Sequence, residues 1–137
     1  MTPEQVERVT RSFGRVFPFR QKLVTQFYDD LFEAAPEARA LFPDDMTSQF
    51  KKLADMLHTV VTLLPNPNSL MPAVKSLGAR HVGYGATEAH YALVGSCLIG
   101  ALRDTTPGGL SEDELAAWQE AYDVLATAMI EAARQAA

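Results

Sequence analysis

Cysteine is almost absent from this chain, and the single residue of that type is Cys97. One thiol cannot form an internal disulfide, and it cannot build a metal site that requires several cysteines. Proteins without disulfides are typical of reducing compartments. We therefore expect a cytoplasmic protein, in which Cys97 serves as a small buried hydrophobic residue.

Long apolar runs and clusters of positive charge are missing as well. The stretch Leu57–Leu64 is interrupted by polar residues and is far too short to span a bilayer. The N-terminal segment is charged, which argues against a signal peptide. No run of Lys or Arg exceeds a pair and the formal net charge is −5, so neither nucleic acid nor an anionic membrane surface is an expected partner.

Strand-like alternation of useful length is also lacking, whereas helical spacing recurs throughout the chain. The segment Thr2–Gln5 has the pattern of a capped helix start, and Ser111–Glu114 is a full capping box that opens the last helix. A chain of 137 residues suits one domain with one core. We predict an all-α fold of six to seven helices, with residues 1–137 as a single domain.

Prolines and apolar spacing place the helices between these two ends. Pro18 can open the second helix, and Glu37–Phe42 is expected to form one tight helical turn. A long helix should begin near residue 47 and end before Pro65. Residues 69–82 are predicted to form the next helix, with a core face of Leu70, Val74 and Leu77.

Two of the three histidines carry little functional signal. His58 lies nine residues after Gln49, about half a revolution further round a helix, so it should face away from the surface that Gln49 presents. We interpret His58 as structural or solvent-facing. His90 falls in the first turn of its helix and is expected to be exposed.

His81 is different because the chain must turn immediately beyond it. A helical pattern runs into this histidine, Gly83 and Gly85 break the pattern, and a new capped helix begins at Thr87. The imidazole is thereby held in the last turn of a helix beside a chain reversal, and the next helix returns with Tyr91. This arrangement can present a single axial ligand to a haem iron.

Other chemistries find weaker support. Paired histidines at zinc-binding spacing do not occur. Gly83-x-Gly85 resembles the start of a dinucleotide-binding loop, but Glu88 occupies the third glycine position and no strand precedes the segment. The sequence neither supports nor excludes a Ser or Cys nucleophile beside a histidine.

Several short motifs, in order and over nearly the whole length, give the chain a family resemblance. They are Phe-Tyr-Asp-Asp-Leu-Phe (27–32), Pro36 to Leu41-Phe42, Gln49 with Leu53, Arg80-His81, His90-Tyr91 to Val94-Gly95, and Ala117-Trp118 to Ala121-Tyr122. Each motif is weak by itself, whereas their order and spacing are specific. The chain resembles the bacterial single-domain haemoglobins and the globin domain of flavohaemoglobins.

The resemblance implies a globin fold around a haem b pocket, with a role for each matched residue. His81 would be the proximal iron ligand, and Phe42 would pack against the haem face. Tyr28 and Gln49 would lie in the distal pocket, with Leu53 as an apolar gate beside them. A phenol and an amide can both donate hydrogen bonds to a bound gas ligand such as dioxygen and slow its dissociation.

The proximal side departs from the family pattern. In flavohaemoglobins a glutamate of the last helix accepts the hydrogen bond of the ligand histidine and is itself held by a tyrosine. Tyr91 matches that tyrosine, but Ala133 stands at the position of the glutamate, and Glu131 lies about 200° round the helix from it. We expect the His81 N–H to donate instead to a backbone carbonyl one turn earlier. An imidazole held in this way is less basic, which favours reversible oxygen binding over peroxide-type chemistry.

The function implied is reversible binding of dioxygen, nitric oxide and carbon monoxide. Arg80 is a candidate contact for a haem propionate. We expect no flavin or nicotinamide domain after the last helix, so nitric oxide dioxygenation would need an external reductase. A haem-based gas or redox sensor acting through a partner, and a globin fold that has lost its haem, are the alternatives. Both a monomer and a homodimer are compatible with the sequence.

Overall fold

The computed structural model describes residues 1–83 and 87–136, and these residues form helices and turns without any strand. The all-α prediction and the expected number of helices are confirmed. The elements in order are α1 (Pro3–Val16), η1 (Phe17–Phe19), α2 (Arg20–Ala34), η2 (Pro36–Leu41), α3 (Thr47–Leu63), α4 (Pro67–Gly83), α5 (Glu88–Thr105) and α6 (Glu112–Ala136). Gly85, which was expected to break the helix after His81, lies outside the described residues.

Local sequence signals place most helix ends correctly. The side chains of Thr2 and Gln5 accept hydrogen bonds from each other's backbone N–H at the start of α1, and Ser111 and Glu114 do the same at the start of α6. Pro18 does not open α2, because it lies inside the 3-10 turn η1 and α2 begins only at Arg20. The tight turn expected at 37–42 is found as η2.

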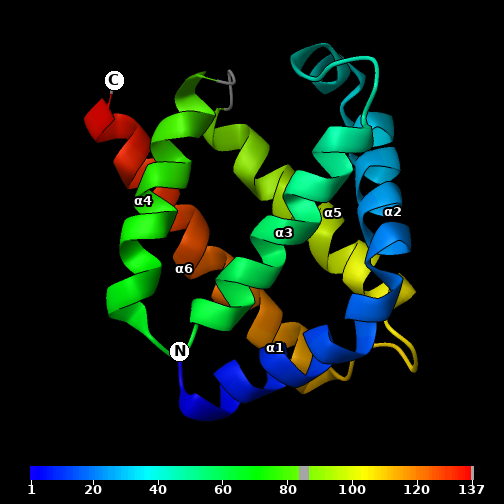
Figure 1. The fold of residues 1–137 in the computed structure, drawn as a ribbon, viewed down its shortest axis with the longest axis vertical. Helices are drawn as coiled ribbons and strands as arrows, with labels where there is room; N and C mark the ends of the chain where they lie inside the picture. Colours follow the sequence, from blue (N-terminus) through cyan, green and yellow to red (C-terminus); the bar gives the residue numbers. More distant parts are fainter. Residues whose placement is uncertain (84–86, 137) are drawn as a thin grey trace.

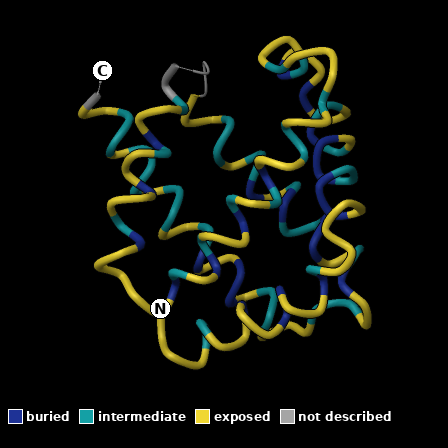
Figure 2. Tube along the Cα trace, in the orientation of Figure 1, coloured by how far each residue is buried: buried dark blue, intermediate teal, exposed yellow. Residues whose placement is uncertain are grey.

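The helices pack in pairs around one apolar core. The main pairings are α4 with α6, α2 with α5 and α1 with α6, whereas α3 and α4 contact each other sparsely. Figure 1 shows α6 running behind the space between the α3 and α4 ribbons, and α5 running behind α3. Buried residues line the inward faces of the helices in Figure 2, and the connections between helices are mostly exposed.

A buried hydrogen bond ties the first helix to the last. The indole N–H of Trp118 in α6 donates to the hydroxyl of Ser12 in α1 over 2.8 Å, and both residues are buried. The Ser12 hydroxyl donates in turn to the carbonyls of Arg8 and Val9. The polar atoms of this pair are therefore satisfied inside the core.

A glycine allows α4 to approach α6 closely. A Cβ atom at Gly78 would lie 2.6 Å from the carbonyl oxygen of Met129 and 2.8 Å from its Cα. Those are backbone atoms, which cannot rotate away as a flexible side chain would. The approach seats α4 on α6 three residues before His81, so it sets where that histidine lies.

This close approach predicts opposite effects for two glycine substitutions. Gly78→Ala should lower the free energy of unfolding by about 1–3 kcal/mol, because the added methyl group forces two helices apart. Gly14→Ala, at an exposed position of α1 with nothing within 4 Å, should raise it by about 0.5–1 kcal/mol through helix propensity. Urea denaturation of both variants is the measurement. A Gly78→Ala protein as stable as the Gly14→Ala protein would show that the α4–α6 contact can relax.

Candidate functional site

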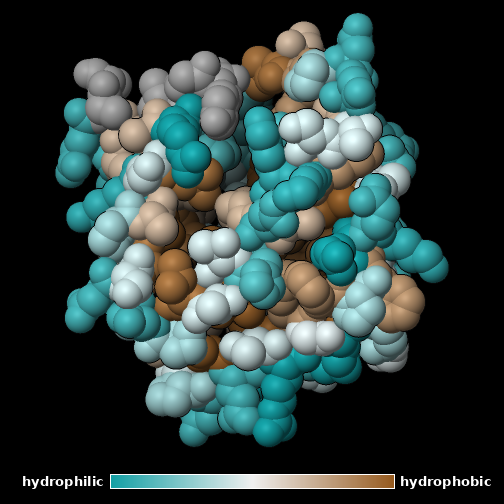
Figure 3. Space-filling view, in the orientation of Figure 1, coloured by the Kyte–Doolittle hydropathy of each residue, from teal (hydrophilic) through white to brown (hydrophobic). Residues whose placement is uncertain are grey.

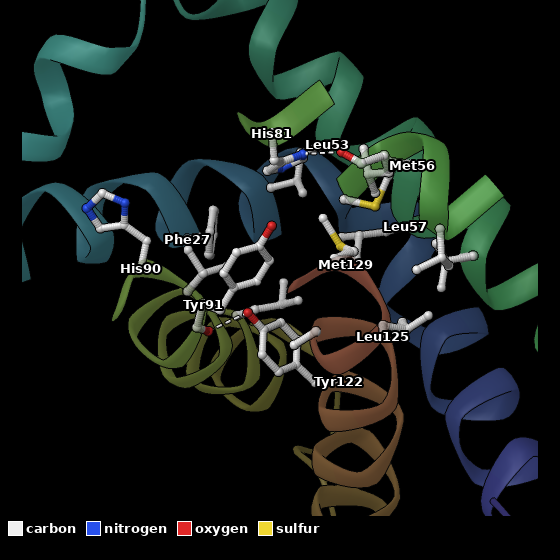
Figure 4. A pocket seen from close by; sticks show the side chains of 16 residues that line it. Phe27, Leu53, Met56, Leu57, His81, His90, Tyr91, Tyr122, Leu125 and Met129 are labelled. Atoms are coloured by element: carbon white, nitrogen blue, oxygen red, sulfur yellow. Dashed lines mark hydrogen bonds between the residues drawn. The ribbon is translucent and has the colours of Figure 1, made fainter. Parts of the chain in front are cut away.

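An apolar cavity lies between α3 and α4, backed by α5 and α6. Its volume is about 140 Å³. Figure 3 shows apolar residues at the floor of a hollow on this face. The lining residues, most of them drawn and labelled in Figure 4, are Phe27, Leu53, Met56, Leu57, Val60, Val74, Leu77, His81, His90, Tyr91, Val94, Leu98, Tyr122, Leu125, Ala126 and Met129.

His81 presents its imidazole to this cavity from the last turn of α4. Its Nδ1 lies 2.8 Å from the carbonyl oxygen of Leu77, one helical turn earlier. A carbonyl oxygen only accepts, so Nδ1 carries the proton and the lone pair of the neutral ring is on Nε2. The expectation that the His81 N–H donates to a backbone carbonyl one turn earlier is confirmed.

Burial keeps this imidazole neutral. Desolvation lowers the pKa of His81, the hydrogen bond to Leu77 opposes that shift, and the nearby charge of Arg80 lowers the pKa further. A neutral imidazole with its proton on Nδ1 is the form in which Nε2 coordinates a metal.

Tyr91 lies beside His81, and Tyr122 lines the same cavity. The ring centroids of Tyr91 and His81 are 6.4 Å apart, and the Tyr91 side chain extends toward His81 in Figure 4. The Tyr122 hydroxyl donates to the backbone carbonyl of Tyr91. The Tyr91 hydroxyl is buried without a hydrogen-bond partner among the described residues, and burial raises its pKa. Tyr91 therefore does not hold the His81 imidazole through a hydrogen bond.

Among the described residues that line the cavity, α6 contributes no carboxylate. Glu131 is exposed, as its position on the helix predicted, and Ala133 is half-buried. Met129, one turn before Ala133, reaches the cavity instead. The proximal hydrogen bond is therefore left to the Leu77 carbonyl, which belongs to the same helix as His81.

The predicted distal residues gather in an aromatic cluster next to the cavity. The amide of Gln49 donates to the Tyr28 hydroxyl over 3.0 Å. The Phe42 ring meets the Tyr28 ring edge-on at 5.5 Å. Phe27 joins the cluster to the cavity, because it lines the cavity and packs against Tyr28 with ring centroids 4.9 Å apart.

Three of the seven predicted site residues, His81, Leu53 and Tyr91, thus line the cavity themselves. Tyr28, Gln49 and Phe42 are brought together behind Phe27 and are not part of the lining. Arg80 is exposed on α4. The structure therefore places the Tyr28 cluster next to the cavity that His81 lines, although the two lie far apart in the sequence. Arg80 remains at the surface.

The other two histidines differ in outcome. His58 is exposed and its ring packs against Phe17, as expected for a structural or solvent-facing residue. The expectation that His90 is exposed is wrong, since it is half-buried and borders the cavity. The backbone N–H of Thr87 donates to His90 Nδ1 over 3.1 Å, so the ring folds back over the start of α5.

Most of the cavity wall consists of apolar residues that the sequence does not mark as a functional site. Met56, Val94 and Met129 carry no chemical signal of their own, and each shares the helical spacing of its buried neighbours. Apolar spacing identifies the inner face of a helix but cannot show whether that face meets another helix or a cavity.

The donor set fits a cofactor that brings its own metal ligands. Across residues 1–83 and 87–136, no group of three or more His, Cys, Asp or Glu side chains could hold a metal ion. The neutral imidazole of His81 in an apolar cavity instead suits a haem iron, for which the porphyrin supplies four nitrogen ligands and the protein one axial ligand. The same described residues include no helix that is both long and apolar enough to cross a membrane.

Comparisons with known proteins agree with this geometry. A flavohemoprotein of Bacillus thuringiensis is 34% identical over 114 residues, which cover 80% of this chain and 27% of that protein. The chain therefore spans about a quarter of the length of this relative. A bacterial globin from Campylobacter jejuni superposes with a TM-score of 0.82 at 26% identity, covering 98% of this chain and 97% of that one.

A second solved structure is also similar over nearly the whole chain. It is an engineered carbene transferase, made from a proposed nitric oxide dioxygenase of Rhodothermus marinus, with a TM-score of 0.87 at 29% identity and coverage of 98% and 94%. The family model named Globin matches residues 25–129. This match shows that the chain belongs to the globin family, whose members bind haem, and the helical architecture agrees with it.

Proposed function

We propose that this protein binds haem b and uses it to bind dioxygen reversibly, with nitric oxide and carbon monoxide as further ligands. The observation that carries the proposal is His81, whose Nδ1 is held by the Leu77 carbonyl inside an apolar cavity. Bound haem would supply a ferrous iron that accepts one diatomic ligand. The cytoplasm and a single domain over residues 1–137 remain our expectations from the sequence.

Different residues of the chain would coordinate the iron, surround the porphyrin ring and contact its propionate. His81 would be the axial ligand, and the walls formed by α3 and α6 would exclude water from the ring. Leu53, the predicted apolar gate, lines the cavity wall and is buried. Arg80, exposed in the last turn of α4, would reach a propionate at the surface.

Tyr28 would act as the distal donor. Burial raises the pKa of its hydroxyl, and the hydrogen bond from Gln49 opposes that shift. The hydroxyl therefore keeps its proton at neutral pH. Because Gln49 donates to the Tyr28 oxygen, that bond uses an oxygen lone pair and leaves the hydroxyl proton to be donated to a gas ligand.

A neutral carbonyl behind the axial histidine supports binding in preference to oxidative turnover. A carboxylate at this position would draw the Nδ1 proton and make the ligand more basic, whereas a carbonyl has a smaller effect. Nitric oxide dioxygenation is the second candidate, supported by the same distal pair and by the Rhodothermus marinus relative. Catalytic nitric oxide dioxygenation would draw electrons from an external reductase. Sustained nitrate production in the presence of that reductase would distinguish it from a single stoichiometric reaction of the oxygen-bound protein with nitric oxide.

Removal of the axial ligand tests the proposal directly. His81→Ala should abolish the Soret band that forms when hemin is added, because it removes the imidazole that would coordinate the iron. His58→Ala is the matched control, since it removes an exposed imidazole, and it should leave hemin binding unchanged. Absorption spectra of the ferric, ferrous and carbon monoxide-bound proteins are the measurement. A normal spectrum for His81→Ala would refute the assignment.

The distal donor can be tested by the rate of oxygen release. Tyr28→Phe should raise the dissociation rate by about 10-fold, as expected for the loss of one hydrogen bond of about 1.4 kcal/mol. Tyr122→Phe removes another half-buried hydroxyl, one that bonds to the Tyr91 backbone, and should affect stability without changing this rate. Stopped-flow measurement on the ferrous protein gives the rates. Equal rates for wild type and Tyr28→Phe would remove Tyr28 from the distal site.

The proximal hydrogen bond predicts a vibrational signature. The ferrous protein should show the low iron–histidine stretching frequency of a carbonyl-bonded axial ligand in resonance Raman spectra. Tyr91→Phe should leave that frequency unchanged and raise the free energy of unfolding by about 1 kcal/mol, because it removes a buried hydroxyl without a described partner. A frequency as high as in peroxidase-like sites, or one that depends on Tyr91, would contradict the geometry.

A further inference from the structure

Arg39, at the end of η2, binds three consecutive backbone carbonyls of the loop that follows it. Its Nη1 donates to the carbonyl oxygens of Phe42 and Pro43 over 3.2 and 2.8 Å, and its Nη2 donates to that of Asp44 over 3.0 Å. The backbone N–H of Phe42 in turn donates to the Arg39 carbonyl over 3.2 Å. One half-buried guanidinium therefore fixes the path of residues 42–44.

The same guanidinium also contacts the aromatic cluster. Its Cζ lies 5.3 Å from the centroid of the Phe32 ring. Phe32 packs against Phe42 edge-on at 5.4 Å and against Tyr28 at 5.8 Å. Arg39 thus joins the loop to α2, the helix that carries Tyr28.

The loop connects two contacts of Tyr28, one to its ring and one to its hydroxyl. At its first residue, Phe42 packs against the Tyr28 ring. At its other end, the Asp45 carboxylate accepts the backbone N–H of Thr47 over 3.0 Å and so begins α3, in which Gln49 lies two residues further on. The position of Gln49 relative to Tyr28 therefore depends on the course of residues 42–46.

We propose that Arg39 is a positioning residue for the distal site: by pinning residues 42–44 to the Phe32 ring, it sets the geometry in which Gln49 and Tyr28 hold a gas ligand. This inference rests on the proposed haem function. Arginine suits the role because its planar fork donates to several oxygens at fixed angles while its face stacks on a ring. A lysine ammonium could keep the charge and the ring contact but could not span three carbonyls in the same way.

The experiment compares Arg39→Met and Arg39→Lys with a matched control, Arg20→Met. The Arg20 guanidinium also lies over a phenylalanine ring, 4.5 Å from the Phe17 centroid, and it also donates to a backbone carbonyl, but it does so at the start of α2 and away from the loop. Two measurements are made on each full-length protein. Hydrogen–deuterium exchange reports on residues 42–47 with or without haem, and stopped-flow oxygen dissociation reports on the haem-loaded protein.

Arg39→Met should accelerate amide exchange across 42–47 and raise the oxygen dissociation rate by about 5-fold, with Arg39→Lys between it and wild type. Arg20→Met should change neither. Unchanged exchange in Arg39→Met would overturn the pinning, and faster exchange with an unchanged dissociation rate would overturn the distal role. If Arg39→Met does not fold, Arg39→Lys decides by the same criteria. Failure of the wild type to take up hemin would refute the proposed function and, with it, the distal role of Arg39. The exchange measurement would still show whether Arg39 holds residues 42–44 in place.

Discussion

The close approach of α4 to α6 is the contact on which the candidate site depends. Gly78 lets α4 rest on the backbone of Met129, and the same seating carries His81 to the wall of the cavity. Because α4 packs on α6 and only sparsely on α3, the inner faces of α3 and α4 are not closed against each other. Apolar side chains of these two helices therefore line a cavity and do not pack against each other.

Burial has opposite effects on the two groups expected to face a gas ligand and its iron, and both effects preserve the neutral form. It lowers the pKa of His81, so the imidazole keeps the lone pair that coordination needs. It raises the pKa of Tyr28, so the phenol keeps the proton that it would donate. Burial in the cavity and burial in the adjacent aromatic cluster thus favour the neutral forms of His81 and Tyr28 respectively.

Features encoded by neighbouring residues could be predicted from the sequence. The capping boxes at Thr2 and Ser111 and the His81–Leu77 hydrogen bond all join residues three or four apart, so helical geometry dictates them. The exposure of His90 was mispredicted because it depends on more than its neighbours in the sequence. Its half-buried position depends on α3, α4 and α6 around the cavity as well as on the cap at Thr87.

By itself the sequence determined the helices, their caps, the tautomer of His81 and the lack of a carboxylate at Ala133. Only the tertiary structure decided which apolar faces meet one another and which line a cavity, since a periodic pattern is the same in both cases. It also decided that Tyr28, Gln49 and Phe42 form one cluster, next to the loop whose carbonyls Arg39 binds. Such contacts depend on the crossing of whole helices, which the packing of α4 on α6 and of α2 on α5 establishes.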